Sequence, residues 1–349
     1  MPQPIDINPP NAVIYGCSGA ALTDAEKAFF ADVRPAGFIL FRRNCQDPDQ
    51  VAALVAGLQD ISGQTPILID QEGGRVQRLG PPHWRDRPAA AAFKALAGRD
   101  MALATEAARL NAELIAAELI SLGINVDCAP VLDIPAPGAH EIIGDRAYGD
   151  DPDTVSALGL AVCEGFLSRG VVPVIKHIPG HGRAGADSHL ELPVVDAAAG
   201  DLMTTDFSPF QALRRMPWAM TAHVVYTALD PDRPATTSAP VIKDTIRGAI
   251  GFEGVLVSDD IGMKALGGPY AERTAQSLAA GCDLVLHCSG EMTEMEDVAK
   301  GLRPLTGETS ARLVRGESML GGAGDWDQDA AQARLDEILA GVPGYGGAG

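Results

Sequence analysis

The sequence predicts an α/β protein with a (β/α)8 TIM-type barrel, and three observations support this fold class. Short apolar runs rich in Val, Ile and Leu recur along the 349 residues, and a helix-like segment follows each of them. The runs are continuously apolar, which is typical of parallel strands that are covered on both faces. Several runs end in polar residues, and this fold carries its active site at the C-terminal ends of its strands.

Eight runs are expected to form the barrel strands, in chain order. They are residues 12–15, 37–41, 66–70, 124–129, 171–176, 219–223, 254–259 and 282–287. An open doubly wound sheet would show a similar alternation of strands and helices. However, no G-x-G-x-x-G sequence follows the first run, and eight runs suit a closed barrel. We therefore favour the barrel.

Helical patterns occupy five of the intervening segments: residues 23–33, 47–62, 100–122, 152–168 and 239–249. Thr23, Asp47 and Ser238 are suitable N-caps, because their side-chain oxygens can accept hydrogen bonds from unpaired backbone N–H groups. Gly123 and Gly170 follow the last turns of two helices, where a left-handed residue commonly ends a helix. We expect a single barrel domain over residues 1–340 and a frayed Gly-rich tail over residues 341–349.

Composition limits the compartment and the partners. The six cysteines are scattered without C-x-x-C spacing, which favours a reducing compartment and offers no zinc site. The N-terminus lacks the basic and apolar regions of a signal peptide, and no apolar run approaches the length of a membrane span. The formal charge of −19 argues against nucleic acid or an anionic membrane as a partner. We therefore expect a soluble, cytoplasmic protein.

Polar residues gather at the expected strand ends. The strand ends and the loops after them supply Asp70, Arg78, Arg146, Lys176, His177, His223, Asp259, Asp260 and His287. Asp259 is the leading candidate for catalysis, since a carboxylate at the mouth of a barrel can act as nucleophile, base or metal ligand. The alternative is that Asp259 or Asp260 caps the following turn.

Five of these residues, Asp70, Arg78, Arg146, Lys176 and His177, form a candidate clamp for a neutral, hydroxyl-rich ligand. Cations and a carboxylate can bind vicinal hydroxyls through paired hydrogen bonds. The alternative is that they form buried ion pairs that close the top of the barrel, for example between Asp70 and Arg78.

The stretch from Lys176 to His189 contains three of the seven histidines and several glycines. Asp187 and His189 are two positions apart, so an extended backbone places both side chains on one side. A carboxylate bonded to an imidazole orients the ring and favours its protonated form, which gives an acid–base group near neutral pH. The alternative, left open by these residues alone, is an Asx turn at Asp187 beside an exposed histidine.

The other histidines have simpler interpretations. His181 can brace the loop, and His223 is interpreted as a core histidine whose ring nitrogens are both bonded. A metal site made from Asp127, His177, His223 and Asp259 is conceivable, but no H-x-H or H-x-x-x-H pair supports it.

Taken together, five blocks of sequence resemble glycoside hydrolase family 3, and in particular its single-domain, cytoplasmic β-N-acetylglucosaminidases. The blocks are residues 37–44, 70–78, 143–149, 176–193 and 258–263, which occur in the order of the family. Ile178, Tyr148 and Gly262 depart from the usual pattern without removing a proposed functional group. The chain shows no sign of the additional sandwich domain of many family 3 β-glucosidases.

The resemblance implies roles for individual residues. Asp259 would be the nucleophile that forms a glycosyl-enzyme intermediate, and His189 would be the general acid/base with Asp187 as its partner. Asp70, Arg78, Arg146, Lys176 and His177 would bind N-acetylglucosamine. The substrate would be terminal β-1,4-linked N-acetylglucosamine on 1,6-anhydro-muropeptides, cleaved during peptidoglycan recycling by a monomer that needs no metal or organic cofactor. The glycines between His177 and Asp187 are expected to act as a hinge.

Three other functions remain as alternatives. A histidine acid/base repels an incoming anion less than a carboxylate would, so a β-glucosaminide phosphorylase that uses phosphate as the acceptor is one alternative. A family 3 β-glucosidase is the second. The third, a non-catalytic sugar-binding barrel, is disfavoured because both Asp259 and His189 are present.

Overall fold

Eight parallel strands close into a barrel in the order β1-β12-β11-β9-β7-β6-β3-β2. The computed structural model describes residues 9–138, 140–188, 190–322, 324, 326–343 and 345. The barrel strands are β1 (Asn11–Gly16), β2 (Pro35–Leu40), β3 (Ile67–Ile69), β6 (Val126–Asp127), β7 (Val172–Ile178), β9 (Trp218–Thr221), β11 (Val255–Asp260) and β12 (Leu284–His287). Each coincides with one of the eight predicted runs, so the predicted barrel is confirmed and the open sheet is excluded.

Three strands end two residues away from the predicted position. One of them, β9, ends at Thr221 and therefore before His223. Strand β7 continues to Ile178, so His177 lies inside the strand and does not begin a loop. Strand β6 ends at Asp127, two residues earlier than expected. Pro130 has no N–H to donate to a neighbouring strand. Beyond Asp127, isolated hydrogen bonds connect this segment to β7, including one from the Lys176 N–H to the Pro130 carbonyl at 3.1 Å.

The five predicted helices are present as α1 (Asp24–Val33), α2 (Pro48–Ser62), α4 (Met101–Ser121), α5 (Pro152–Ser168) and the π-helix η4 (Val241–Ala249). Thr23 forms a capping box with Glu26, and the Asp47 carboxylate accepts the Gln50 N–H at 2.9 Å. Ser238 lies before η4, and its hydroxyl accepts the Val241 N–H at 3.2 Å. Gly123 and Gly170 follow their helices with φ of 80° and 84°, which confirms their predicted left-handed role.

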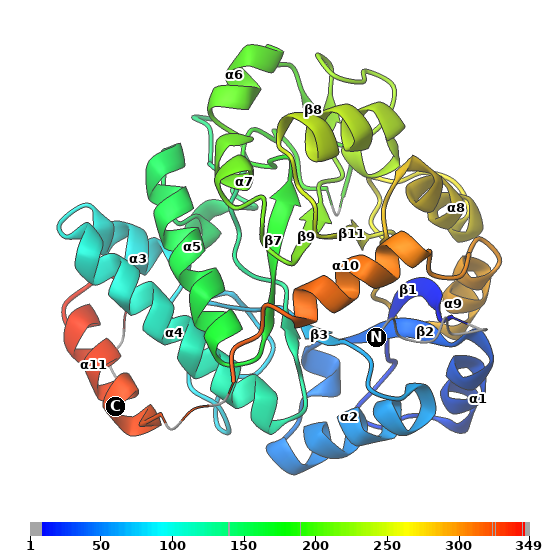
Figure 1. Ribbon diagram of the computed structural model, residues 1–349, viewed down its shortest axis with the longest axis horizontal. Coiled ribbons are helices and arrows are strands. Elements are labelled where there is room, and N and C mark those ends of the chain that lie inside the picture. The colour runs from blue at the N-terminus through cyan, green and yellow to red at the C-terminus, as the bar shows by residue number, and fades with distance from the viewer. Residues whose placement is uncertain are drawn as a thin grey trace.

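Further helices lie around the barrel, and one of them, α10, crosses its end (Figure 1). They are α3 (Ala90–Ala97), α6 (Ala199–Thr204), α7 (Ser208–Ala212), α8 (Tyr270–Ala280), α9 (Met292–Ala299), α10 (Gly307–Glu317) and α11 (Gln328–Leu339), with short 3₁₀ turns η1 (Arg42–Asn44), η2 (Gly144–Arg146) and η3 (Ala235–Thr237). Within the described residues, no helix is both long and apolar enough to cross a bilayer.

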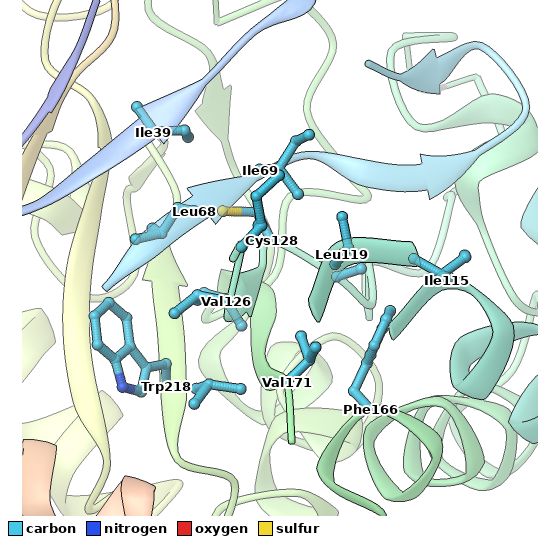
Figure 2. Packing of buried hydrophobic residues seen from close by; sticks show 14 of the residues in the cluster. Ile39, Leu68, Ile69, Ile115, Leu119, Val126, Cys128, Phe166, Val171 and Trp218 are labelled. Atoms are coloured by element: carbon cyan, nitrogen blue, oxygen red, sulfur yellow. The ribbon is translucent and has the colours of Figure 1, made fainter. Parts of the chain in front are cut away.

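The core fills the space between the barrel wall and its helices. In Figure 2, Ile115 and Leu119 of α4 and Phe166 of α5 lie against Val126 and Val171 on the strand side. Helices α4 and α5 approach closely at Gly165, where an added Cβ would lie 2.6 Å from the Arg109 carbonyl oxygen. This close packing fixes the wall from which strands β6 and β7 present their polar ends.

The N-terminal end of the barrel is covered by α10 (Figure 1). Asp283, directly before β12, accepts a hydrogen bond from Thr309 at 2.9 Å and pairs with Arg312 at 2.7 Å. Gly316 lies beside Trp218 at the start of β9. Because α10 spans this end, the C-terminal end is left to form the site.

Candidate active site

The C-terminal ends of the strands surround a cavity of about 290 Å³. It is lined by Ile39, Phe41, Asp70, Glu72, Arg75, Val76, Arg78, Ile142, Arg146, Lys176, His177, Met220, Asp259, Asp260, Leu286 and Cys288. The five residues of the predicted clamp and the predicted nucleophile Asp259 therefore line one cavity, although they come from separate parts of the sequence.

Lys176 occupies the centre of the polar wall. It is 2% exposed, and its Nζ lies 2.9 Å from Asp70 Oδ1 and 2.6 Å from Glu72 Oε1. Asp70 also accepts a hydrogen bond from Arg78 at 3.0 Å. The predicted ion pair between Asp70 and Arg78 is thus present, as part of a larger array in which one buried ammonium joins two carboxylates.

Arg146 joins this array through Glu72. Its Nε and Nη2 each donate to one oxygen of the Glu72 carboxylate at 2.8 Å, which is a bidentate pair. Glu72 lies on β4 (Gln71–Gly73), which forms an antiparallel hairpin with β5 (Val76–Gln77) after β3. The hairpin therefore carries both the carboxylate and the backbone that leads to Arg78.

The array keeps its carboxylates ionised. Burial alone would raise the pKa of Asp70, but Lys176 and Arg78 outweigh it and hold that pKa well below its usual range. For Glu72, burial is likewise outweighed by Lys176 and Arg146, and its pKa falls to about 2. The cavity wall thus presents fixed charges of both signs, which suits a neutral ligand that is rich in hydroxyls.

His177 is oriented by a residue that sequence reasoning missed. Its Nδ1 lies 2.6 Å from Oδ2 of Asp133, which is fully buried. Burial would raise the pKa of Asp133, but His177 outweighs it and the net shift is downward, so this carboxylate is an acceptor. His177 therefore donates through Nδ1 to Asp133, which leaves Nε2 as the ring nitrogen available to a ligand in the cavity.

The adjacent carboxylates of Asp259 and Asp260 have different surroundings. Asp260 Oδ1 accepts the Gly262 N–H at 2.9 Å and the Cys288 N–H at 3.2 Å, so it holds the turn after β11. Asp259 Oδ1 accepts the N–H of Asp260 at 2.8 Å. The turn-capping role considered for either aspartate thus belongs to Asp260, and both side chains line the cavity.

His223 and His287 lie near the mouth without lining the cavity. His223 is fully buried, with Nδ1 2.7 Å from the Thr236 hydroxyl and Nε2 3.0 Å from the Asp260 carbonyl, which confirms the interpretation of a bonded core histidine. His287 is also buried, and burial lowers its pKa to about 4. Among the described residues, no three His, Cys, Asp or Glu side chains are grouped to hold a metal ion.

The predicted acid–base pair is described only in part. Asp187 is half-buried and is not among the residues that line the cavity, and His189 lies outside the described residues. The Asp187 carbonyl accepts the N–H groups of Leu190 and Glu191 at 2.9 and 3.0 Å, so the backbone turns at this point.

The glycines before Asp187 serve different purposes. An added Cβ at Gly182 would lie 1.8 Å from the Ile134 carbonyl oxygen, and one at Gly180 would lie 3.0 Å from Asp206. Gly180 also has φ of 142°, which disfavours any side chain. Close backbone packing therefore accounts for glycine at positions 180 and 182, while the expectation that the glycines act as a hinge stays a prediction. Gly185 is exposed, and a Cβ added there would meet no atom of the other described residues within 4 Å.

The fold and the polar cavity define an α/β barrel with a site at the carboxyl ends of its strands. The family model for the glycosyl hydrolase family 3 N-terminal domain matches residues 13–314 of this sequence. A beta-hexosaminidase from Alkalilimnicola ehrlichii is 40% identical over 283 residues, which cover 79% of this chain and 80% of that protein. The chain therefore belongs to glycosyl hydrolase family 3, which confirms the resemblance drawn from its motifs.

Solved structures agree with this assignment. Native NagZ from Neisseria gonorrhoeae is 32% identical, with a TM-score of 0.86 and coverage of 95% of this chain and 99% of that one. NagZ from the same organism in complex with N-trifluoroacetyl-D-glucosamine has the same TM-score and identity, and covers 96% and 100% of the two chains.

Replacing Lys176 with Met should destabilise the protein strongly, because it leaves the largely buried Asp70 and Glu72 carboxylates without their shared cation. Removing one partner from a buried ion pair typically costs about 3–5 kcal/mol. Denaturant unfolding of the two proteins measures the difference. Lys94→Met is the matched control, since Lys94 and Asp150 form a pair at 2.6 Å with 39% and 66% of their side chains exposed. That pair should contribute no more than about 1 kcal/mol, and equal losses in both variants would contradict this account.

Asp127 should make stability fall as the pH rises. Its Oδ1 accepts the Gln71 N–H at 3.0 Å, its Oδ2 has no hydrogen-bond partner among the described residues, and burial raises its pKa to about 8. The folded protein therefore keeps a proton that an unfolded chain releases near pH 4, so the free energy of unfolding decreases between about pH 4 and pH 8.

Asp127→Asn should remove this dependence, since the amide keeps an acceptor for Gln71 and does not ionise. Its Tm relative to wild type should be higher at pH 9 than at pH 5, as measured by thermal unfolding at both pH values. A constant difference in Tm would show that Asp127 is already ionised in the folded protein.

Proposed function

We propose that the protein is a retaining exo-β-N-acetylglucosaminidase that releases terminal β-1,4-linked N-acetylglucosamine. The observation that carries the proposal is that Asp259 lines the same cavity as Asp70, Arg78, Arg146, Lys176 and His177. A carboxylate placed beside a set of fixed hydrogen-bonding groups meets the first requirement of a retaining glycosidase. The names of the relatives, a beta-hexosaminidase and NagZ, support this class of substrate.

In this proposal the polar array binds the sugar. The Asp70 carboxylate accepts hydrogen bonds from one or two hydroxyls, while Arg78 and Lys176 donate to the same groups. The Nε2 atom of His177 is available to the sugar because Nδ1 is hydrogen-bonded to Asp133. These groups are already ion-paired and oriented before the sugar arrives, so little reorganisation accompanies binding.

Asp259 then attacks the anomeric carbon and forms a covalent glycosyl-enzyme intermediate. His189, paired with Asp187, protonates the leaving oxygen in this step. In the second step it removes a proton from the water that releases the sugar. A histidine in this role departs from the usual pair of carboxylates, and its ordinary pKa near neutrality suits both steps. The reaction needs no metal or organic cofactor.

We further propose that the natural substrates are 1,6-anhydro-muropeptides released during peptidoglycan recycling, and that a monomer acts on them in the cytoplasm. The complex of NagZ with N-trifluoroacetyl-D-glucosamine supports recognition of an N-acylated glucosamine. All six cysteines are free thiols, as suits a reducing compartment.

A chromogenic N-acetyl-β-glucosaminide should be hydrolysed by the wild-type protein and not measurably by Asp259→Ala, because the variant cannot form the intermediate. Removing the nucleophile should lower kcat by at least about 10³-fold. Mass spectrometry after incubation with a 2-fluoro sugar should find the label on Asp259. The matched control is Asp260→Asn, whose amide oxygen can still hold the turn, and which should lose far less activity. A label on any other residue, or no turnover by wild type, would refute the proposed mechanism.

The acceptor and the sugar can be tested in the same assay. If water is the acceptor, added phosphate leaves the rate unchanged and the product is the free sugar. A sugar 1-phosphate product would favour the alternative of a β-glucosaminide phosphorylase. Faster turnover of the matched β-glucoside would favour a family 3 β-glucosidase.

A further inference from the structure

Ser188 lies between Asp187 and His189 in the sequence and is 3% exposed. Its hydroxyl oxygen lies 3.2 Å from Nε2 of His181, and its carbonyl accepts the N–H of Ala265 at 3.2 Å. This buried residue thus makes one contact within its own loop, which follows strand β7, and one with the loop that follows strand β11.

On the β7 side, the contact leads to the sugar-binding wall. The backbone N–H of His181 donates to Asp133 Oδ1 at 2.6 Å, and the other oxygen of that carboxylate binds His177. The rings of His177 and His181 also contact each other edge to face, with centroids 5.7 Å apart. The Ser188 hydroxyl is therefore connected through His181 and Asp133 to the side chain of His177, which lines the cavity.

On the β11 side, the contact leads to the proposed nucleophile. Ala265 belongs to the turn that begins at Asp260, in which the Met263 N–H donates to the Asp260 carbonyl at 3.0 Å. Asp259 precedes this turn and lines the cavity. Ser188 is thus bonded to the loops that follow the strands of both His177 and Asp259.

The bond between Ser188 and His181 is between neutral groups. Burial, followed by the neighbouring His177, lowers the pKa of His181 to about 4, so its ring is uncharged near neutral pH. The ring is 3% exposed, and its Nδ1 has no hydrogen-bond partner among the described residues. Nε2 is therefore the ring atom through which His181 holds the segment.

We propose that Ser188 is a positioning residue for general acid catalysis. Its two hydrogen bonds hold the described backbone directly before His189 against the loops that follow the sugar-binding strand β7 and the nucleophile strand β11. This inference rests on the proposed function. Its physical basis is that a general acid must lie within hydrogen-bond reach of the oxygen it protonates, and that small displacements cost much of the rate. Ser188 itself does not touch the substrate.

If Ser188 has a positioning role, its replacement should lower kcat/KM by a factor that depends on the leaving group of the substrate. A 2,4-dinitrophenolate departs without a proton, so cleavage of its glycoside hardly needs the acid. The sugar alkoxide released from N,N′-diacetylchitobiose needs one. For both substrates kcat/KM reports the steps up to bond cleavage, so the comparison isolates the acid from the later attack of water.

Ser188→Ala removes the hydroxyl but keeps the carbonyl bond to Ala265. We expect kcat/KM to fall about tenfold on N,N′-diacetylchitobiose, as for the loss of one aligning hydrogen bond, and less than about twofold on the dinitrophenyl glycoside. The matched control is Ser168→Ala, which removes a hydroxyl that donates to the Gly165 carbonyl at 2.8 Å near the opposite end of the barrel. It should change neither value.

His181→Phe removes the hydrogen bond between His181 and Ser188 by changing the other partner, and it keeps an aromatic ring at position 181. This variant supplies the test if Ser188→Ala fails to fold. It should give the same dependence on the leaving group, and the double variant should lose no more than the larger single loss. Equal losses on both substrates, unchanged kinetics on both, or additive losses in the double variant would each overturn the proposal. Failure of the proposed function is distinguishable, because the wild-type protein would then hydrolyse neither substrate.

Discussion

The arrangement of the site depends on one buried ammonium group between two carboxylates whose side chains are 15% and 8% exposed. Lys176 contacts Asp70 and Glu72, and through them it is linked to Arg78 and Arg146. An isolated charge at this depth would be neutralised by a shift of its pKa, so each member of the array depends on the others for its ionised state. The barrel makes this array possible because the C-terminal ends of β3 and β7 lie at the same end of the barrel, with β6 between the two strands. Helix α10 covers the other end.

The sequence predicted the barrel well because its strands are buried on both faces and therefore read as unbroken apolar runs. It also indicated that the five residues of the candidate clamp lie at one end of the barrel, since they either end strands or belong to motifs of the family, and all five line the cavity. It did not reveal Glu72, although that residue follows Asp70 by two positions and an extended chain would place both side chains on the same side. The hairpin of β4 and β5, which fixes Glu72, has strands too short to give a recognisable pattern.

Asp133 and Ser188 were missed for a different physical reason. Asp133 contacts His177, and Ser188 contacts His181 and Ala265, and no local sequence pattern encodes such pairs. Asp259 and Asp260 illustrate the same limit. Both are aspartates at the end of one strand, and only the backbone N–H groups of Gly262 and Cys288 show which of them holds the turn.

The unequal packing of the glycines divides the segment between β7 and Ser188 into two parts with different tolerance to change. Gly182 contacts the Ile134 backbone so closely that a library of all substitutions at this position should be almost empty of folded variants. Gly185, with open space around it, accepts a side chain. A cysteine introduced at Gly185 therefore offers an attachment point for a fluorescent label beside the proposed acid–base segment, from which its movements during turnover can be followed.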